Sequence, residues 1–204
     1  MAETAPAGTV ASRNPLKTLA LLDSAKLGVH PERCVQVRHK NANCMRCAGV
    51  CTTGAITRED DRLQVRPEAC IGCGTCASAC PSGCLEAKNP ADAELESALL
   101  RALSRGKGRV ALACEPGLQE ARTIAGAEEV LADGAPVIGI VCLGRAEESL
   151  LAEAAARGAA SVSLVYHACE TCTHRPGGAL AEEMCASACE LLAAFESPCT
   201  VRRM

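Results

Sequence analysis

The stretch CIGCGTCASACP, residues 70–81, carries four cysteines with the spacing C-x2-C-x2-C-x3-C-P. Three closely spaced cysteines can hold three corners of one cubane iron–sulfur cluster, while the fourth is carried away to a second cluster. Structural zinc sites are the competing interpretation, because they also use Cys-x2-Cys pairs. Zinc usually takes its ligands as two pairs, whereas this stretch supplies a triplet and a distant fourth cysteine. The spacing therefore favours iron–sulfur chemistry.

This stretch is part of an internal repeat. The segment CMRCAGVCTTGAI at residues 44–56 matches CGTCASACPSGCL at residues 73–85, with an offset of 29 residues (73 − 44). Between the copies, residues 56–65 (ITREDDRLQV) have apolar ends around a charged turn, which predicts a small hairpin. Each copy is too short to bury a core alone, so we expect the two to pack together about a pseudo-twofold axis.

The cysteine content raises the alternative of a disulfide scaffold, because the 204 residues include 16 cysteines. Two features argue against it. The cysteines are bunched at spacings of two and three, and the first residues, MAETAPAGTVASRNPLK, lack the pattern of a signal peptide. We therefore expect reduced thiols in the cytoplasm of an anaerobe. No apolar run is long enough for direct membrane insertion. The net charge of -3, with one Tyr and one Phe, indicates no nucleic-acid role.

The pattern of the chain changes after residue 106. The apolar runs GRVALAC (108–114), PVIGIVC (136–142) and ASVSLVYHAC (160–169) are separated by helical patterns at residues 116–134 and 144–158. This alternation predicts parallel strands joined by crossover helices. We expect four segments along the chain: a tail with a short helix at 14–28 (1–33), a cysteine-dense domain (34–90), a connecting helix (91–106) and an α/β domain (107–204).

Four cysteines of the α/β domain occupy corresponding places. Cys114 ends the first predicted strand, Cys142 ends the second, and Cys169 and Cys172 follow the third. Right-handed crossovers place these strand ends at one edge of the sheet, where ligands of open α/β sheets bind. The alternative, that each is an ordinary core cysteine, does not explain the matching positions. We therefore predict a third metal site formed by these four thiols.

The cysteine-dense domain, on this motif and its repeat, closely resembles the dicluster bacterial-type ferredoxins. The resemblance implies an α+β ferredoxin-like domain that binds two 4Fe–4S clusters. It implies that one cluster is held by Cys51, Cys70, Cys73 and Cys76. It implies that the other is held by Cys44, Cys47, Cys80 and one further cysteine.

The chain departs from the ferredoxin pattern at two positions. Asn41 stands where a cysteine is expected, three residues before Cys44, and Thr52 stands where a proline is expected. We assign Cys34 as the missing ligand, because the nine residues between it and Cys44 can loop it back. A three-iron cluster with an open corner is the alternative. Cys84 is interpreted as a small buried side chain of the core.

The α/β domain is similar to the iron–sulfur delta subunit of methyl-viologen-reducing hydrogenase, which pairs with heterodisulfide reductase. The matching segments are LACE (112–115), VCLGR (141–145) and GAASVSLVYHACETC (158–172). The resemblance implies that a 2Fe–2S cluster is bound by Cys114, Cys142, Cys169 and Cys172. That family has a second cysteine where this chain has Gly117. A 4Fe–4S cluster, and ligation by Cys185 or Cys189, therefore stay open.

The expected fold is an α+β ferredoxin-like dicluster domain followed by a small α/β domain with a parallel sheet of three or more strands. We interpret the chain as a non-catalytic subunit that relays single electrons through two 4Fe–4S clusters and a 2Fe–2S cluster. The expected partner is a hydrogenase, a heterodisulfide reductase-like flavoprotein, or a molybdenum or tungsten oxidoreductase. The alternatives are a thiol–disulfide enzyme or cluster-based redox sensor using Cys169 and Cys172, or a docking module fused to a ferredoxin.

Overall fold

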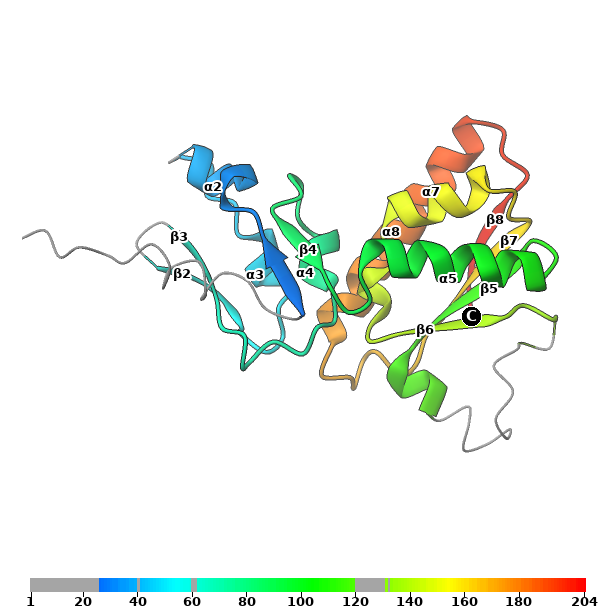
Figure 1. Ribbon diagram of the computed structural model, residues 1–204, viewed down its shortest axis with the longest axis horizontal. Helices are drawn as coiled ribbons and strands as arrows, with labels where there is room; N and C mark the ends of the chain where they lie inside the picture. Colours follow the sequence, from blue (N-terminus) through cyan, green and yellow to red (C-terminus); the bar gives the residue numbers. More distant parts are fainter. Residues whose placement is uncertain (1–25, 40, 60–61, 120–130, 132) are drawn as a thin grey trace, which may run out of the picture.

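The protein has two halves that lie side by side (Figure 1). The cysteine-dense half precedes helix α5 (Asp92–Arg105), and the α/β half begins with that helix. The cysteine-dense half consists of short strands and helices, and the α/β half contains a sheet and longer helices. The computed structural model describes residues 26–39, 41–59, 62–119, 131 and 133–204.

Two antiparallel strand pairs form the frame of the cysteine-dense half. The strands are β1 (Leu27–Val29), β2 (Ile56–Glu59), β3 (Arg62–Val65) and β4 (Leu85–Ala87). β2 and β3 form the hairpin that the sequence predicts, with Ile56 opposite Val65. β1 pairs with β4 from the far end of the same half, with Leu27 opposite Ala87. The second pair therefore holds the beginning and the end of the half together.

The sequence repeat is also a structural repeat. Helix α3 (Arg46–Gly49) and helix α4 (Thr75–Ser78) begin 29 residues apart (75 − 46) and contact each other. Two further short elements, η1 (Pro31–Arg33) and α2 (Val35–Arg38), precede the first copy. Around them lies a small core in which five aliphatic side chains pack against cysteines: Leu27, Ile56, Leu63, Val65 and Leu85.

The α/β half contains a parallel sheet of four strands in the order β6-β5-β7-β8. The strands are β5 (Arg109–Cys114), β6 (Val137–Ile140), β7 (Ser161–Val165) and β8 (Thr200–Arg203). β5, β6 and β7 coincide with the three predicted apolar runs. The predicted parallel sheet is therefore confirmed and carries one additional strand.

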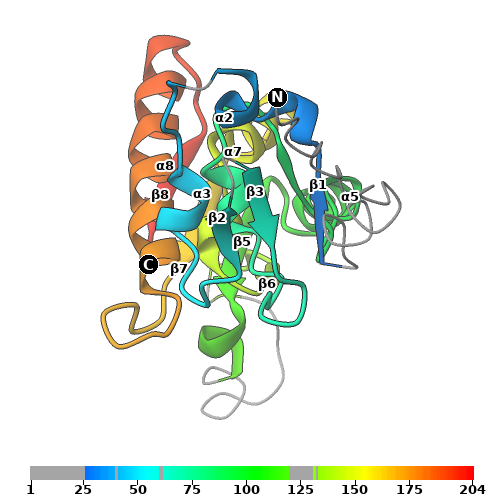
Figure 2. The same cartoon turned by 90° about the vertical axis from the view of Figure 1, so that its left-hand side faces the viewer.

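Three helices cover one face of this sheet. α7 (Glu148–Ala156) lies between α5 and α8 (Arg175–Ala194) and contacts both of them (Figures 1 and 2). Leu95 and Leu99 of α5, one turn apart, are both buried against the sheet. The five residues of β5 from Val110 onward are buried as well, as a central parallel strand requires. Each fully buried leucine stabilises the fold by roughly 1.5–3 kcal/mol.

Some sequence expectations differ from the structure. Of the helix expected at 14–28, residues 14–25 lie outside the described residues, and residues 27 and 28 belong to strand β1. The connecting helix is present, but it begins at Asp92. Of the helix expected at 116–134, residues 116–119 are helical, and most of the remainder is not described. Among the described helices, none is long and apolar enough to cross a membrane.

Candidate metal centres

The first cysteine group surrounds a small, largely apolar cavity. Its walls include all four thiols assigned from the sequence to the first cluster, and one more. Cys34 lies between η1 and α2, while Asn41 is absent from the lining residues. The cysteines of this cavity are Cys34, Cys44, Cys47, Cys80 and Cys84.

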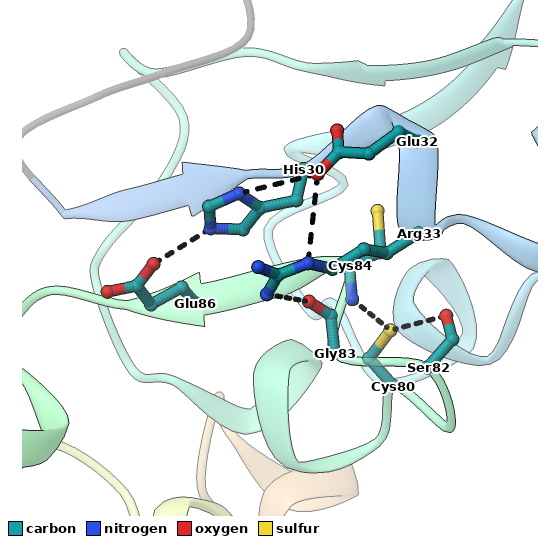
Figure 3. A network of polar contacts seen from close by, with 8 residues as sticks. All are labelled: His30, Glu32, Arg33, Cys80, Ser82, Gly83, Cys84 and Glu86. Carbon is teal, nitrogen blue, oxygen red and sulfur yellow. Dashed lines mark hydrogen bonds and ion pairs between the residues drawn. The ribbon is translucent and has the colours of Figure 1, made fainter.

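The sulfur of Cys80 is held by a local network (Figure 3). The backbone N–H of Cys84 donates to Cys80 Sγ at 3.3 Å, and Ser82 Oγ lies 3.7 Å from the same sulfur. Burial acts to raise the pKa of Cys80, but these donors and the N–H groups of Ser82 and Leu85 lower it below its ordinary value. The lowered pKa favours the thiolate form of Cys80, which is the form that binds metal.

Cys84 lines this cavity as well and, as the sequence predicts, is a buried side chain of the core. Its side chain is 2% exposed, and its thiol makes a hydrogen bond with Cys34. Burial, followed by the neighbouring Cys34 and Cys80 sulfurs, raises the pKa of Cys84 to about 12. A thiol that keeps its proton can donate it to a ligating sulfur. The corresponding position of the first repeat, Ala55, is also buried.

The second cysteine group surrounds another small cavity. It brings together the four thiols assigned to the second cluster: Cys51, Cys70, Cys73 and Cys76. Gly72 and Gly74 both have φ of +76°, a conformation that lets the chain turn around the cavity and that other residues rarely adopt. Burial, followed by the sulfurs of Cys73, Cys70 and Cys51, raises the pKa of Cys76.

The third cysteine group surrounds a small cavity at the carboxyl edge of the parallel sheet. Cys114 ends β5, Cys142 follows β6, and Cys169 and Cys172 follow β7; all four line this cavity. The convergence predicted from the strand ends is therefore present. Burial raises the pKa of Cys142 to about 11, although hydrogen bonds to its sulfur act in the opposite direction.

The backbone near the third cavity leaves room for the sulfurs. A Cβ at Gly178, in the first turn of α8, would stand 2.8 Å from Cys169 Sγ, which is too close for any larger side chain. His174 also lines this cavity, and its backbone N–H donates to Cys172 Sγ at 3.3 Å.

Three other cysteines of the α/β half lie elsewhere. Cys185 packs against the core of the sheet, and Cys199 belongs to that core. The exposed Cys189 donates from its thiol to the carbonyl oxygen of Val201 at 3.5 Å. None of the three is among the residues that line the third cavity.

The donor sets fit iron–sulfur clusters. All 16 cysteines are free thiols. Burial, and then the sulfurs of Cys80, Cys34 and Cys44, raises the pKa of Cys47 to about 11. Such crowded thiols become stable thiolates when bound iron supplies positive charge. Within the described parts of the chain, no three Cys, His, Asp or Glu side chains converge closely enough to hold a single metal ion.

Two buried polar side chains also fit clusters at these positions. Gln36 is 4% exposed and lines the first cavity, and neither of its amide atoms has a hydrogen-bond partner among the described residues. His174 lines the third cavity, and its buried Nδ1 likewise lacks a partner in the described structure. Buried polar atoms normally bond to something, and the sulfurs of a cluster accept such bonds.

A family model for 4Fe–4S binding domains matches residues 63–86 of the chain. The matched segment contains Cys70, Cys73, Cys76 and Cys80. It lies within the cysteine-dense half, so the resemblance of residues 107–204 to the hydrogenase delta subunit stays a prediction.

Curated relatives share a short stretch with this chain. Electron transport protein HydN of Escherichia coli (strain K12) is 52% identical over 40 residues, which are 20% of this chain and 23% of HydN. Hydrogenase-4 component A of the same strain is 44% identical over 41 residues, 20% of each protein. The isethionate sulfite-lyase activating enzyme of Nitratidesulfovibrio vulgaris is 39% identical over 64 residues, 30% of this chain and 20% of the enzyme.

The chain thus spans less than a quarter of the length of these relatives. Over that stretch it is homologous to electron-transport proteins of the HydN type. The chain carries a 4Fe–4S binding segment, and this homology supports a general role in iron–sulfur electron transfer.

Proposed function

We propose that this protein is a non-catalytic subunit that relays single electrons through two 4Fe–4S clusters and a third, 2Fe–2S cluster. The observation that carries the proposal is the division of twelve cysteines among three cavities, four from each expected ligand set. Each cluster, when bound, supplies a one-electron redox couple. The residues of the chain hold the clusters in place and adjust their potentials.

The assignment of a 2Fe–2S cluster to the third centre rests on two features of the α/β half. Four thiols line the third cavity, from Cys114, Cys142, Cys169 and Cys172. The resemblance of this half to the hydrogenase delta subunit implies a 2Fe–2S cluster held by these four residues.

The proposed partner is an oxidoreductase of anaerobic metabolism in the cytoplasm. Relatives that share the short stretch are named as an electron transport protein and as a hydrogenase component. These names support an electron carrier that serves a larger redox enzyme. A hydrogenase, a heterodisulfide reductase-like flavoprotein and a molybdenum or tungsten oxidoreductase are the partner classes that would use such a carrier.

Metal analysis tests this proposal. We expect the anaerobically purified chain to contain about ten iron atoms, the sum of two 4Fe–4S clusters and one 2Fe–2S cluster, with matching acid-labile sulfide. An iron count near eight would contradict the third centre. Stoichiometric zinc at the dense motif would contradict the relay altogether. Free Cys169 and Cys172 thiols in the iron-loaded protein would instead support the thiol–disulfide alternative.

A further inference from the structure

The second and third cysteine groups meet at a joint between the two halves. The joint consists of helix α4, the turn η2 (Leu143–Arg145) and the first turn of α8. Helix α4 starts two residues after Cys73, and η2 starts directly after Cys142. Helix α4 and turn η2 contact each other. Cys73 of the second group and Cys142 of the third therefore lie on opposite sides of this contact. In Figure 1, α4 lies on the side of its half that faces α8.

Thr75 is the central side chain of this joint. It is 2% exposed, and its hydroxyl lies beside Cys142 Sγ: a Cβ at Gly177, in the first turn of α8, would contact both Thr75 Oγ1, at 3.0 Å, and Cys142 Sγ. A Cβ at Gly144 would stand 2.7 Å from Thr75 Oγ1 and 2.8 Å from Thr75 Cγ2. Glycine at position 144 is therefore what allows the threonine to reach the cysteine. The hydroxyl of the second centre's helix thus contacts a ligand sulfur of the third centre.

Arg145 fixes the same joint. Its side chain is 3% exposed and forms ion pairs with Asp92 and with Glu147, the latter at 3.3 Å. Its aliphatic part lies against the backbone of Gly74, where a side chain would overlap it. A buried guanidinium needs such carboxylate partners to offset its desolvation. The packing of Arg145 against Gly74 therefore joins η2 to the loop that carries Cys73, and the ion pairs hold the guanidinium in place.

The contacts between the elements that carry the thiols give the order of the three groups. Helix α3, which contains Cys47 of the first group, contacts helix α4, which contains Cys76 of the second. Helix α4 in turn contacts η2, which directly follows Cys142 of the third group. Cys34 of the first group directly precedes α2, which lies on the far side of the cysteine-dense half from the sheet (Figure 1). The second group is thus the middle member of a series.

We propose that electrons reach the third centre from the second across the Thr75–Cys142 contact, and that Thr75 is the positioning residue that sets the potential of the third centre. This inference rests on the proposed relay function. When one electron crosses the joint, the second centre is oxidised by one electron and the third is reduced by one electron. No bond is formed or broken, and no proton is transferred. Hydrogen bonds to ligand sulfurs favour the reduced, more negative state, so the Thr75 hydroxyl raises the potential of the third centre.

The test compares Thr75→Val with Thr75→Ser in the full, iron-loaded chain, because both variants keep every cysteine. Thr75→Val removes the hydroxyl at nearly constant volume. We expect it to shift the potential of the third centre to more negative values, by about fivefold in the electron-exchange equilibrium with the second centre. Thr75→Ser should keep the original potential. EPR-monitored redox titration measures both. An unchanged potential in Thr75→Val, or equal shifts in both variants, overturns the role of the hydroxyl.

A second arm tests the order of the series. In the fully reduced chain, the EPR signal of the third centre should be broadened by its paramagnetic neighbour. We expect Cys70→Ser, in the second group, to remove this broadening, and Cys44→Ser, in the first group, to leave it. The opposite result overturns the order. The iron content is measured in each sample. About ten iron atoms per chain without broadening of the third centre's EPR signal would overturn only this inference, whereas about eight iron atoms would overturn the relay of three centres.

Discussion

Replacing Cys142 with serine is expected to eliminate the third centre and to leave the other two intact. Cys142 is one of the four cysteines that line the third cavity, and all four belong to the α/β half. A serine hydroxyl is a poor substitute for a thiolate toward iron. We expect iron analysis to show a loss of about two of about ten iron atoms, with the 4Fe–4S EPR signals retained.

Cys189→Ser is the matched control for that variant. Cys189 belongs to the same half, is exposed, and is not among the residues that line the third cavity. The Cys189→Ser protein should therefore retain all of its iron. Should Cys142→Ser keep about ten irons, its cavity is not a metal centre, and the α/β half is a docking module. A loss of all iron would show that the three sites are not independent.

The first centre should depend on Cys34 but not on Cys84. Without the Cys34 thiolate, one cubane is expected to lose about one iron and become a three-iron cluster, or to lose all four of its irons. Cys84→Ala removes a protonated thiol that donates to Cys34. The iron content should then stay complete, while the potential of the first centre moves to more negative values because a hydrogen bond to a ligand sulfur is lost.

Iron analysis and EPR of Cys34→Ala and Cys84→Ala decide between these two thiols. Alanine is tolerated sterically at position 84, because Ala55 occupies the corresponding position of the first repeat and is buried. Two unchanged 4Fe–4S signals in Cys34→Ala would show that Cys34 is not the ligand. If Cys84→Ala also lost iron, Cys84 would take that place instead.

The parts of the protein that the sequence could predict are those fixed by local spacing. The C-x2-C-x2-C pattern forces three thiols around one turn, and the repeat with its offset of 29 appears again as helices α3 and α4. The apolar runs that end at Cys114 and Cys142 became parallel strands with a common carboxyl edge. Topology alone brings those strand ends together.

The parts that the sequence could not predict depend on contacts between distant segments. Strand β8 (TVRR) is mostly exposed and has no apolar alternation, and its pairing with β7 defines it. Strand β1 has only three residues and forms through its partner β4. Thr75 and Arg145 look like ordinary surface residues in the sequence, and their burial arises only when the two halves meet.

The most direct test of the relay is a reductive titration of the intact, iron-loaded chain with a strong one-electron reductant, followed by visible absorbance and EPR. We expect the protein to take up about three electrons, one for each of two 4Fe–4S clusters and one 2Fe–2S cluster. Each electron should bleach iron–sulfur absorbance and produce a paramagnetic signal. Uptake of electrons in pairs without bleaching would contradict the relay and indicate thiol–disulfide chemistry, and uptake of only two would remove the third centre from it.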